Sequence, residues 1–212
     1  MIRVLLVDDH QLVREGIKQL LGATPDVVVA AEAGNGDDAL AQVKAAAFDV
    51  VVLDMSMPGL AGIDLVKRVR LEKPRQRILV LSMHGEQQYA ARALKAGAAG
   101  YLTKDTAAAE LVGAIRKIAA GGVYITEAVA AHLVAAPAVT DGPPHARLSD
   151  REFEVFRQLV DGRSVGEIAD RLNLSVKTVS THKMRILQKM NLHGTADLVR
   201  YALQHGLAGD AG

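Results

Sequence analysis

Short apolar runs alternate with amphipathic stretches along the first 122 residues. The runs are rich in Val, Ile and Leu and, apart from Arg3 and Arg77, carry no charged residue, which is typical of strands buried on both faces. They span residues 2–7, 27–31, 50–53, 77–81 and 99–102. Helix-like stretches lie near residues 10–22, 36–46, 62–72, 86–96 and 107–120. This alternation predicts an α/β fold, a flavodoxin-like doubly wound five-stranded parallel sheet in the order 2-1-3-4-5.

The pattern changes after residue 122, where breaker residues separate two regions. Residues 123–146 form a linker, in which Thr126 could cap one short helix over residues 126–136. Proline, glycine and aspartate follow this stretch and favour turns. From residue 147 to 207 apolar positions recur at helical spacing without a strand pattern. The sequence therefore predicts two domains, 1–122 and 147–207, joined by this linker.

Serines mark where helices of the second domain would begin. Two of them have glutamate three positions on, which is the spacing of a capping box: Ser149 with Glu152 and Ser164 with Glu167. A third helix would follow Ser175 after a tight turn, and a fourth would end at Gly206. The second domain is therefore predicted to be an all-α module of four helices.

The composition narrows the class of protein. Basic and acidic residues balance, at 25 against 24, and half of the 212 residues are hydrophobic, which excludes a wholly disordered or polybasic chain. Cysteine is absent, so disulfides, thiolate zinc sites and cysteine nucleophiles are excluded. The early carboxylates Asp8 and Asp9 do not suit a signal peptide, and the apolar runs are too short to span a membrane. We expect a cytoplasmic protein without membrane contact.

Polar side chains stand where four of the predicted strands end. They are Asp8 and Asp9 after the first strand, Asp54 after the third, Ser82 at the end of the fourth and Lys104 after the fifth. In the order 2-1-3-4-5 these strands are contiguous, so their ends meet at one rim, where ligands bind in open parallel sheets. Three carboxylates so close repel one another unless a cation lies among them. Mg²⁺, with oxygen ligands, suits a site that also receives phosphate.

A phosphoryl group is the ligand that these side chains fit. Aspartate is a covalent acceptor of phosphate in enzymes, and Asp54 is central, whereas Asp8 and Asp9 would hold the metal. Lys104 would supply a cation and Ser82 a hydroxyl group for the phosphoryl oxygens. Each aspartate alone is more often a helix cap or a loop carboxylate. Their combination with the hydroxyl group and the lysine indicates a phosphorylation site.

Several motifs of the first domain occur together. They are Asp8-Asp9, Asp54-Met55-Ser56-Met57-Pro58 with Gly62, Leu81-Ser82 and Gly100-Tyr101-Leu102-Thr103-Lys104. With this combination, residues 1–122 resemble the receiver domain of two-component response regulators. The resemblance implies that Asp54 accepts phosphate from a phosphohistidine on a sensor histidine kinase. It also implies Mg²⁺ on Asp9 and Asp54, with Asp8 nearby and the backbone carbonyl of Ser56 as a further ligand.

Two pairs of residues would transmit and tune the phosphorylated state. Ser82 and Tyr101 match the pair that rearranges in the receiver family: Ser82 would move toward the phosphoryl group and Tyr101 would fill the vacated space. Tyr101 could instead be a strand residue with a solvated hydroxyl group. Ser56 and His84 lie two residues beyond the phosphoacceptor and the switch hydroxyl. They could flank the water path and set the phosphoryl lifetime, or His84 could be an ordinary loop residue.

One position departs from the receiver pattern. Many receivers have proline after the lysine, whereas Asp105 follows Lys104 in this chain. A cis bond without proline would cost about 3 kcal/mol. The Asp105 carboxylate could instead cap the helix that begins near Ala107.

The third helix of the second domain has an apolar and a polar side. It is predicted over residues 176–190, after a short turn from the helix at 164–172, which fits helix-turn-helix spacing. At 100° per residue, Val179, Ile186 and Met190 share one side and face the core. The opposite side carries Lys177, Ser180, Thr181, Met184, Arg185 and Gln188. The helix has four basic residues and no acidic one, so this side fits the major groove of DNA, unless it is simply solvated.

A second set of motifs lies in this domain. They are Leu148-Ser149-Asp150-Arg151-Glu152, Gly162-Arg163-Ser164, Glu167-Ile168-Ala169, Leu174-Ser175, Lys177-Thr178-Val179, His182, Ile186 and Lys189-Met190. With these motifs, residues 147–207 resemble the LuxR-type helix-turn-helix. Joined to a receiver, they identify the chain as a member of the NarL/FixJ class of response regulators. The resemblance implies transcription control through duplex DNA, usually by a dimer.

The resemblance also implies which residues contact DNA. Its base-reading positions are Ser180, Thr181 and Met184, of which Met184 cannot donate a hydrogen bond and could only touch thymine methyl groups or fill space. The expected DNA contacts are Lys177, Thr178, Ser180, Thr181, Lys183, Met184, Arg185 and Lys189. His182, at the edge of the apolar stripe, is a packing residue or a base reader. In the last helix, Leu198 and Tyr201 contribute to a dimer contact, or Leu198 packs in the core.

The sequence as a whole predicts a response regulator transcription factor rather than an enzyme. Phosphorylation of Asp54 would decide whether the helical domain dimerises on DNA. One alternative is a DNA-binding regulator that never uses phosphate. A second alternative is a phosphatase of the haloacid-dehalogenase type, but such enzymes have the nucleophile after the first strand in an Asp-x-Asp pattern.

Overall fold

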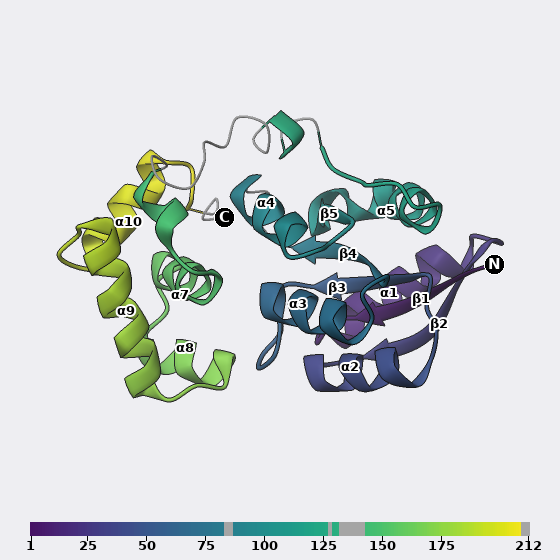
Figure 1. The fold of residues 1–212 in the computed structure, drawn as a ribbon, viewed down its shortest axis with the longest axis horizontal. Helices are drawn as coiled ribbons and strands as arrows, with labels where there is room; N and C mark the ends of the chain where they lie inside the picture. The colour runs from purple at the N-terminus through teal and green to yellow at the C-terminus, as the bar shows by residue number, and fades with distance from the viewer. Residues whose placement is uncertain (83–86, 127–128, 132–142, 209–212) are drawn as a thin grey trace. The chain divides into compact units, whose positions relative to one another are not determined.

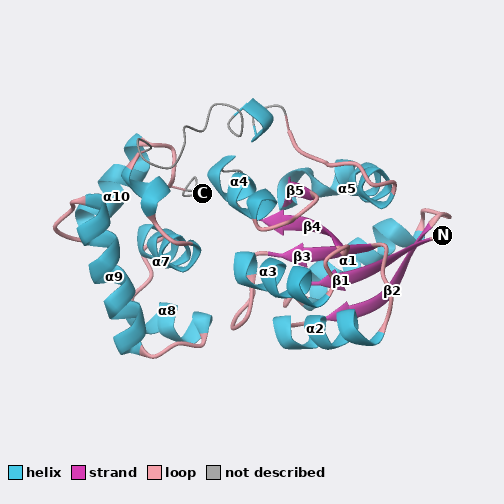
Figure 2. Cartoon of the chain, viewed as in Figure 1, coloured by secondary structure: helices cyan, strands magenta, loops and turns pink. Residues whose placement is uncertain are grey.

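The computed structural model describes residues 1–82, 87–126, 129–131 and 143–208. The chain divides into two compact units, Met1–Leu133 and Val134–Gly212. Figures 1 and 2 show a sheet flanked by helices in the first unit and a group of helices in the second. Among the described residues, no helix is both long and apolar enough to cross a membrane.

The sheet of the first unit has five parallel strands in the order β2-β1-β3-β4-β5, as predicted. The strands are β1 (Ile2–Val7), β2 (Val27–Ala33), β3 (Val50–Asp54), β4 (Arg77–Ser82) and β5 (Gly100–Thr103). The helices are α1 (Gln11–Gly22), α2 (Gly36–Ala45), α3 (Gly62–Glu72), α4 (Gln87–Lys95) and α5 (Lys104–Ala119). The predicted doubly wound fold is therefore confirmed.

Helices cover both faces of this sheet (Figure 2). On one face, α1 and α5 bury Leu21 and Ile115 against apolar side chains of the strands. Helices α2 and α3 contact each other and turn Val43 and Val66 inward. All five residues of β3 are buried, because this central strand is covered from both sides. Its last residue, Asp54, is thereby carried into the interior.

The chain returns to the sheet after α5, which the sequence did not predict. Tyr124 forms a parallel bridge with Gly100. The Tyr124 N–H donates to the Ala99 carbonyl (2.9 Å), and the Tyr101 N–H donates to the Tyr124 carbonyl (3.1 Å). The Tyr124 hydroxyl group also donates to Glu110 of α5 (2.7 Å). This segment covers the outer edge of β5, so the receiver holds the start of the linker.

Helix α5 begins earlier than the sequence predicted. Lys104 is its first residue and Thr103 precedes it, so the expected cap by Asp105 before Ala107 is wrong. Asp105 lies in the first turn, where a carboxylate is favourable because the helix dipole is positive there. No cis peptide bond occurs among the described residues.

The described residues of the second unit form one 3-10 turn and four α-helices. They are η1 (Pro144–Arg147), α7 (Asp150–Val160), α8 (Val165–Leu172), α9 (Val176–Met190) and α10 (Thr195–Gln204). Both predicted capping boxes, at Ser149 and Ser164, are confirmed. The turn η1 was not predicted. Of the predicted linker helix, residues 129–131 are helical, whereas residues 127, 128 and 132–136 lie outside the described residues.

Helices α8 and α9 both end at an asparagine in the left-handed region. Asn173 has φ 51° and Asn191 has φ 53°. The N–H groups of Leu174 and Leu192 donate to carbonyls five residues back, at 2.8 and 2.9 Å. This Schellman pattern stops each helix, and asparagine tolerates the backbone conformation better than most other residues. The turn between α8 and α9 is thus set by one residue, Asn173.

Candidate phosphoacceptor and nucleic-acid sites

Three charged side chains meet at the carboxyl edge of the sheet. Asp8 follows β1, Asp54 ends β3, and Lys104 follows β5. Lys104 Nζ lies 2.8 Å from Asp8 Oδ2 and 3.1 Å from Asp54 Oδ2, although Asp8 and Lys104 are 96 residues apart in sequence. Asp8 is 1% exposed and Asp54 is 0% exposed. Two buried carboxylates therefore share one ammonium group.

The surroundings of Asp54 shift the pKa of its carboxyl group. Burial raises the pKa of Asp54 above its ordinary value; the charge of Lys104 opposes this shift without cancelling it, and the charge of Asp8 adds to it. The backbone N–H of Ser56 donates to Asp54 Oδ1 (3.2 Å). A further positive charge at this place would stabilise the ionised carboxylate.

Lys104 stays positively charged in this site. Burial alone would lower its pKa, but the hydrogen bond to Asp8 and the charges of Asp54 and Asp8 outweigh burial and raise it. The ammonium group is thus a fixed cation beside Asp54. An anionic group that arrived at Asp54 would find its charge partly neutralised.

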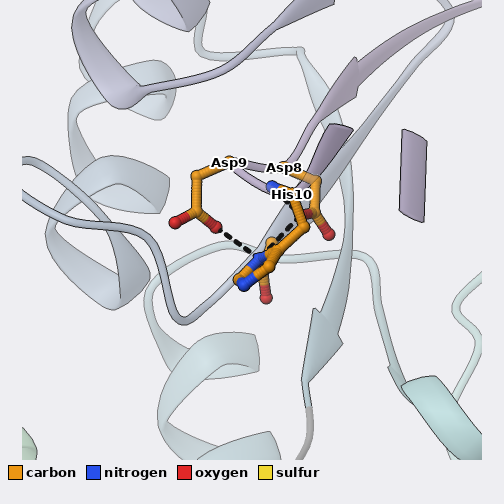
Figure 3. A group of neighbouring side chains, drawn as sticks. Asp8, Asp9 and His10 are labelled. Atoms are coloured by element: carbon orange, nitrogen blue, oxygen red, sulfur yellow. Dashed lines mark hydrogen bonds and ion pairs between the residues drawn. The ribbon is translucent and has the colours of Figure 1, made fainter. Parts of the chain in front are cut away.

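Asp9 and His10 extend the acidic cluster on its more exposed side. His10 Nδ1 lies 2.9 Å from Asp9 Oδ1 and 3.4 Å from Asp8 Oδ1, and Figure 3 shows the imidazole ring reaching toward both carboxylates. One ligand atom from each of Asp8, Asp9, His10 and Asp54 lies within 4.8 Å of the others. Apart from this contact with His10, no hydrogen bond to the buried Asp9 Oδ1 is found among the described residues. Three carboxylates so arranged fit a hard divalent cation.

His10 is a member of this cluster that sequence reasoning did not select. The signal that could have found it is its place directly after the aspartate pair, because the backbone turn after β1 returns its side chain to them. The His10 N–H donates to Asp8 Oδ1 (2.8 Å), which fixes this turn.

The predicted switch residues lie in the interior of the sheet. Ser82 ends β4 with no exposed surface and is in register with Thr103. Tyr101 is 4% exposed and is in register with Val80, so its ring is buried rather than in solvent. Ser56 is partly buried, directly after β3. His84 lies outside the described residues.

Helix α9 has one buried and one exposed side, as predicted. Val179, Ile186 and Met190 are buried. The exposed residues are Val176, Lys177, Thr178, Ser180, Met184, Arg185, Gln188 and Lys189. Thr181 and Lys183 are partly buried. Each residue assigned to DNA from the sequence therefore has some solvent-accessible surface on this helix.

The basic residues of α9 differ in their partners. Within the described ranges, no ion pair engages Lys177, Lys183 or Arg185. Lys189 Nζ instead lies 2.6 Å from Oε2 of the buried Glu152. Burial alone would raise the pKa of Glu152, but the hydrogen bonds from Lys189 and from the backbone at the start of α7 lower it. Lys189, predicted to contact DNA, already has an anionic partner inside the domain.

His182 lies between the two sides of α9. Burial lowers its pKa, and the positive charges of Arg151 and Arg185 lower it further. Its Nδ1 atom is buried and has no hydrogen-bond partner in the part of the chain that the structure describes. A neutral, partly buried ring fits packing better than base reading.

The second unit also contains polar contacts that the sequence did not indicate. His145 of η1 is buried, and its Nδ1 atom lies 2.6 Å from the Tyr201 hydroxyl group of α10. The Tyr201 ring stacks on His205 at 4.0 Å between centroids. The buried Arg157 donates to the Leu207 carbonyl. These contacts join segments far apart in the chain, so no local pattern announces them.

Comparison with known protein families assigns each of the two units to a family. Residues 4–116 match the family described as "Response regulator receiver domain". Residues 146–202 match "Bacterial regulatory proteins, luxR family". Response regulator UvrY of Escherichia coli (strain K12) is 40% identical over 210 residues, which are 98% of this chain and 96% of that protein. Response regulator GacA of Pseudomonas syringae pv. syringae (strain B728a) is 36% identical over 210 residues, 98% of each.

Solved structures are similar to the whole of this chain or to part of it. Salmonella enterica serovar Typhimurium RcsB, bound to promoter rprA in the presence of phosphomimetic BeF3⁻, is similar at a TM-score of 0.69 and 28% identity, over 95% of this chain and 98% of that chain. A LuxR-family two-component response regulator from Aurantimonas sp. SI85-9A1 has a TM-score of 0.59 at 38% identity, over 62% of this chain and 94% of that chain.

A receiver domain followed by a LuxR-type helix-turn-helix domain defines a class of regulatory proteins. The chain belongs to the two-component response regulators of the NarL/FixJ class, which regulate transcription. The predicted class, fold and general function are thereby confirmed. The proteins of this family regulate transcription and are not typically enzymes.

Proposed function

We propose that a phosphoryl group on Asp54, supplied by a sensor histidine kinase, switches this regulator. The observation that carries the proposal is the meeting of Asp54, Asp8 and Lys104 at one buried edge of the sheet. A buried carboxylate beside a fixed cation is suited to receive an anionic group, because the cation offsets the charge that arrives.

The transfer would form a bond from an Asp54 carboxylate oxygen to phosphorus and break the bond from phosphorus to the kinase imidazole nitrogen. The electron pair of the broken bond stays on that nitrogen, which regains its neutral form. The ligands of Mg²⁺ would be Asp8, Asp9, Asp54 and the backbone carbonyl of Ser56. The bound ion would neutralise charge on the phosphoryl oxygens. Lys104 would keep its bond to Asp8 and meet a phosphoryl oxygen.

Ser82 and Tyr101 would carry the signal away from Asp54. The Ser82 hydroxyl group would donate to a phosphoryl oxygen, and the buried Tyr101 ring would follow into the vacated space. Ser56 and His84 would flank the path of the attacking water and set the phosphoryl lifetime. A Ser56 variant with an unaltered dephosphorylation rate would contradict this role.

The DNA-binding proposal places the exposed side of α9 in the major groove. Lys177, Lys183 and Arg185 would hold phosphates, with Thr178 near the helix start. Ser180, Thr181 and Met184 would face base edges. Lys189 would have to exchange Glu152 for a phosphate.

The protein would act as a phosphorylation-dependent homodimer in the cytoplasm, without membrane contact and without catalytic turnover. Its working parts would be a receiver over residues 1–122, a linker over 123–146 and a DNA-binding domain over 147–207.

The test compares the full chain with Asp54→Asn. Both proteins are incubated with a small acyl-phosphate donor and Mg²⁺, then examined by intact mass and by DNA mobility shift. Wild type should gain one phosphoryl group and bind DNA more tightly, whereas Asp54→Asn should do neither.

Three results would contradict this scheme. Labelling of Asp54→Asn would place the phosphate elsewhere. Equal DNA binding by both proteins, with and without donor, would favour a regulator that never uses phosphate. Steady release of phosphate from small phosphoesters, instead of a stoichiometric acyl phosphate, would favour a phosphatase.

A further inference from the structure

Helix α9 exposes two large apolar side chains as well as its basic side chains. Met184 is 68% exposed and Val176 is 56% exposed. Met184 lies in the middle of the helix, and on a helical wheel it falls roughly 160° from the buried Ile186. Met184 thus takes no part in the core and is available to a partner at the centre of the basic face of α9.

Two threonine hydroxyl groups of α9 are already used within the helix or its cap. Thr181 Oγ1 donates to the Lys177 carbonyl (2.9 Å). Thr178 Oγ1 lies 2.7 Å from Ser175 Oγ, at the helix cap. A hydroxyl group has a single proton, so Thr181 offers a base its methyl group and its acceptor lone pairs, but no donor. Met184 and the Thr181 methyl group therefore give this face an apolar contact point between the polar side chains of Ser180 and Gln188.

Cations stand around this apolar contact point. Lys177 lies two turns before Met184 and Arg185 directly after it, and both are exposed. Such cations hold backbone phosphates and bring the intervening side chains to the base edges. The occupant is thus a polyanion that offers an apolar group in its groove, which in duplex DNA is the 5-methyl group of thymine.

We propose that Met184 is a specificity-determining residue that selects an A·T pair through apolar contact with the thymine 5-methyl group, with the Thr181 methyl group alongside. The inference rests on the proposed binding of α9 in the major groove. Guanine, adenine and cytosine present mainly hydrogen-bonding groups there, and a thioether would remove water from them without giving a donor in exchange. Met184 would thus distinguish thymine from the other bases in two ways. Its contact with the thymine methyl group is favourable, whereas its contact with the polar groups of the other bases is unfavourable.

The experiment uses the full chain with acyl-phosphate donor and Mg²⁺. Duplexes that wild type retains from a randomised pool are first isolated. Each thymine in one such duplex is then replaced in turn by deoxyuridine, which lacks only the 5-methyl group. Binding is measured for wild type, Met184→Ala and Met184→Leu, the last of which keeps an apolar side chain of similar volume.

One thymine should be sensitive to the loss of its methyl group. Wild type and Met184→Leu should lose about fourfold in affinity at that position, which corresponds to burial of one methyl-sized group. Met184→Ala should bind the thymine duplex and the deoxyuridine duplex with affinities within about 1.5-fold of each other. This ratio is well below the effect of burying one methyl group.

Two results overturn the inference while DNA binding stands. One is that no deoxyuridine replacement weakens wild type. The other is that Met184→Ala remains as sensitive as wild type at the same position. Retention of no duplex at all is a different result, because it overturns the proposed groove binding itself.

Discussion

The two functional regions of this regulator place charge in opposite ways. The receiver site brings Asp8, Asp54 and Lys104 together at the ends of three strands, with both carboxylates buried and Lys104 partly buried, so that each charge depends on the others. Helix α9 presents its cations on one continuous segment, and Lys177 and Arg185 are exposed. Charges in a low-dielectric interior interact several times more strongly than charges in water. Single substitutions should therefore disturb stability in the receiver and affinity in α9.

The largest effect is expected for Lys104→Ala. This change leaves Asp8 and Asp54 buried without their shared cation, which should lower the free energy of unfolding by about 3 kcal/mol. Denaturant titration of the full chain, monitored for the receiver transition, measures the loss. Added Mg²⁺ should restore part of it, because a cation would again lie between the carboxylates.

Lys44→Ala is the matched control for Lys104→Ala. Lys44 forms a 3.0 Å ion pair with Glu72, but both side chains are exposed, so its loss should matter much less. Equal destabilisation by the two variants would show that burial does not make the Lys104 ion pairs stronger than the Lys44 ion pair.

The second effect concerns Glu152→Gln in the DNA-binding unit. Glutamine keeps the capping geometry but loses the charge that binds Lys189, which should cost about 1.5 kcal/mol of stability. Glu167→Gln is the control, because Glu167 has the same capping position without such a lysine. Thermal unfolding of both variants isolates the contribution of the Lys189 bond, and identical melting temperatures would contradict it.

The Glu152 contribution should also depend on pH. Its pKa is lower in the folded state, so the stabilisation is fully present above the ordinary glutamate pKa and is lost as the pH falls through the folded value. Wild type and Glu152→Gln should thus converge in stability in acid, below about pH 4, near the ordinary glutamate pKa. A constant difference down to pH 3 would assign the effect to another cause.

The third effect separates two lysines of α9. Lys177→Ala should weaken DNA binding across all sequences by about tenfold and reduce the salt slope by about 1. Lys189→Ala should change the slope less, because Lys189 is bound to Glu152. Titrations at several salt concentrations measure both slopes. Equal slopes for the two variants would mean that Lys189 leaves Glu152 when DNA arrives.

The smallest effect is expected at Thr181. Thr181→Val keeps the methyl group and removes a hydroxyl group that bonds within the helix, so affinity should stay within about twofold. Thr181→Ser keeps the hydroxyl group and loses the methyl group, and it should bind about threefold more weakly. The reverse order, measured on the same duplex, would show that the hydroxyl group contacts the DNA.

The sequence was a good guide wherever a local pattern carried the information. Short apolar runs located the strands, since strands covered on both faces tolerate few polar residues. The glutamates that follow Ser149 and Ser164 located two helix starts, because a capping box is complete within four residues. The convergence of Asp8, Asp54 and Lys104 then followed from strand order alone.

The sequence was a poor guide wherever distant segments pair. The bond between Glu152 and Lys189 joins two helices, and the contact of His145 with Tyr201 joins the linker end to α10. The return of Tyr124 to β5 has no motif either. Such contacts depend on how elements pack, and many pairs of side chains could have made them. The early start of α5 was missed because helix ends are the least constrained by pattern.

The position of α9 does not depend on the side chains that would read DNA. Ser175 caps its start, Asn191 ends it, and the buried Val179 holds it to the domain. Ser180 and Met184 take no part in these contacts. Exchange of such outward residues can therefore redirect the regulator to other promoters without refolding it, so a duplicated copy of this gene could acquire a new regulon in a few mutational steps.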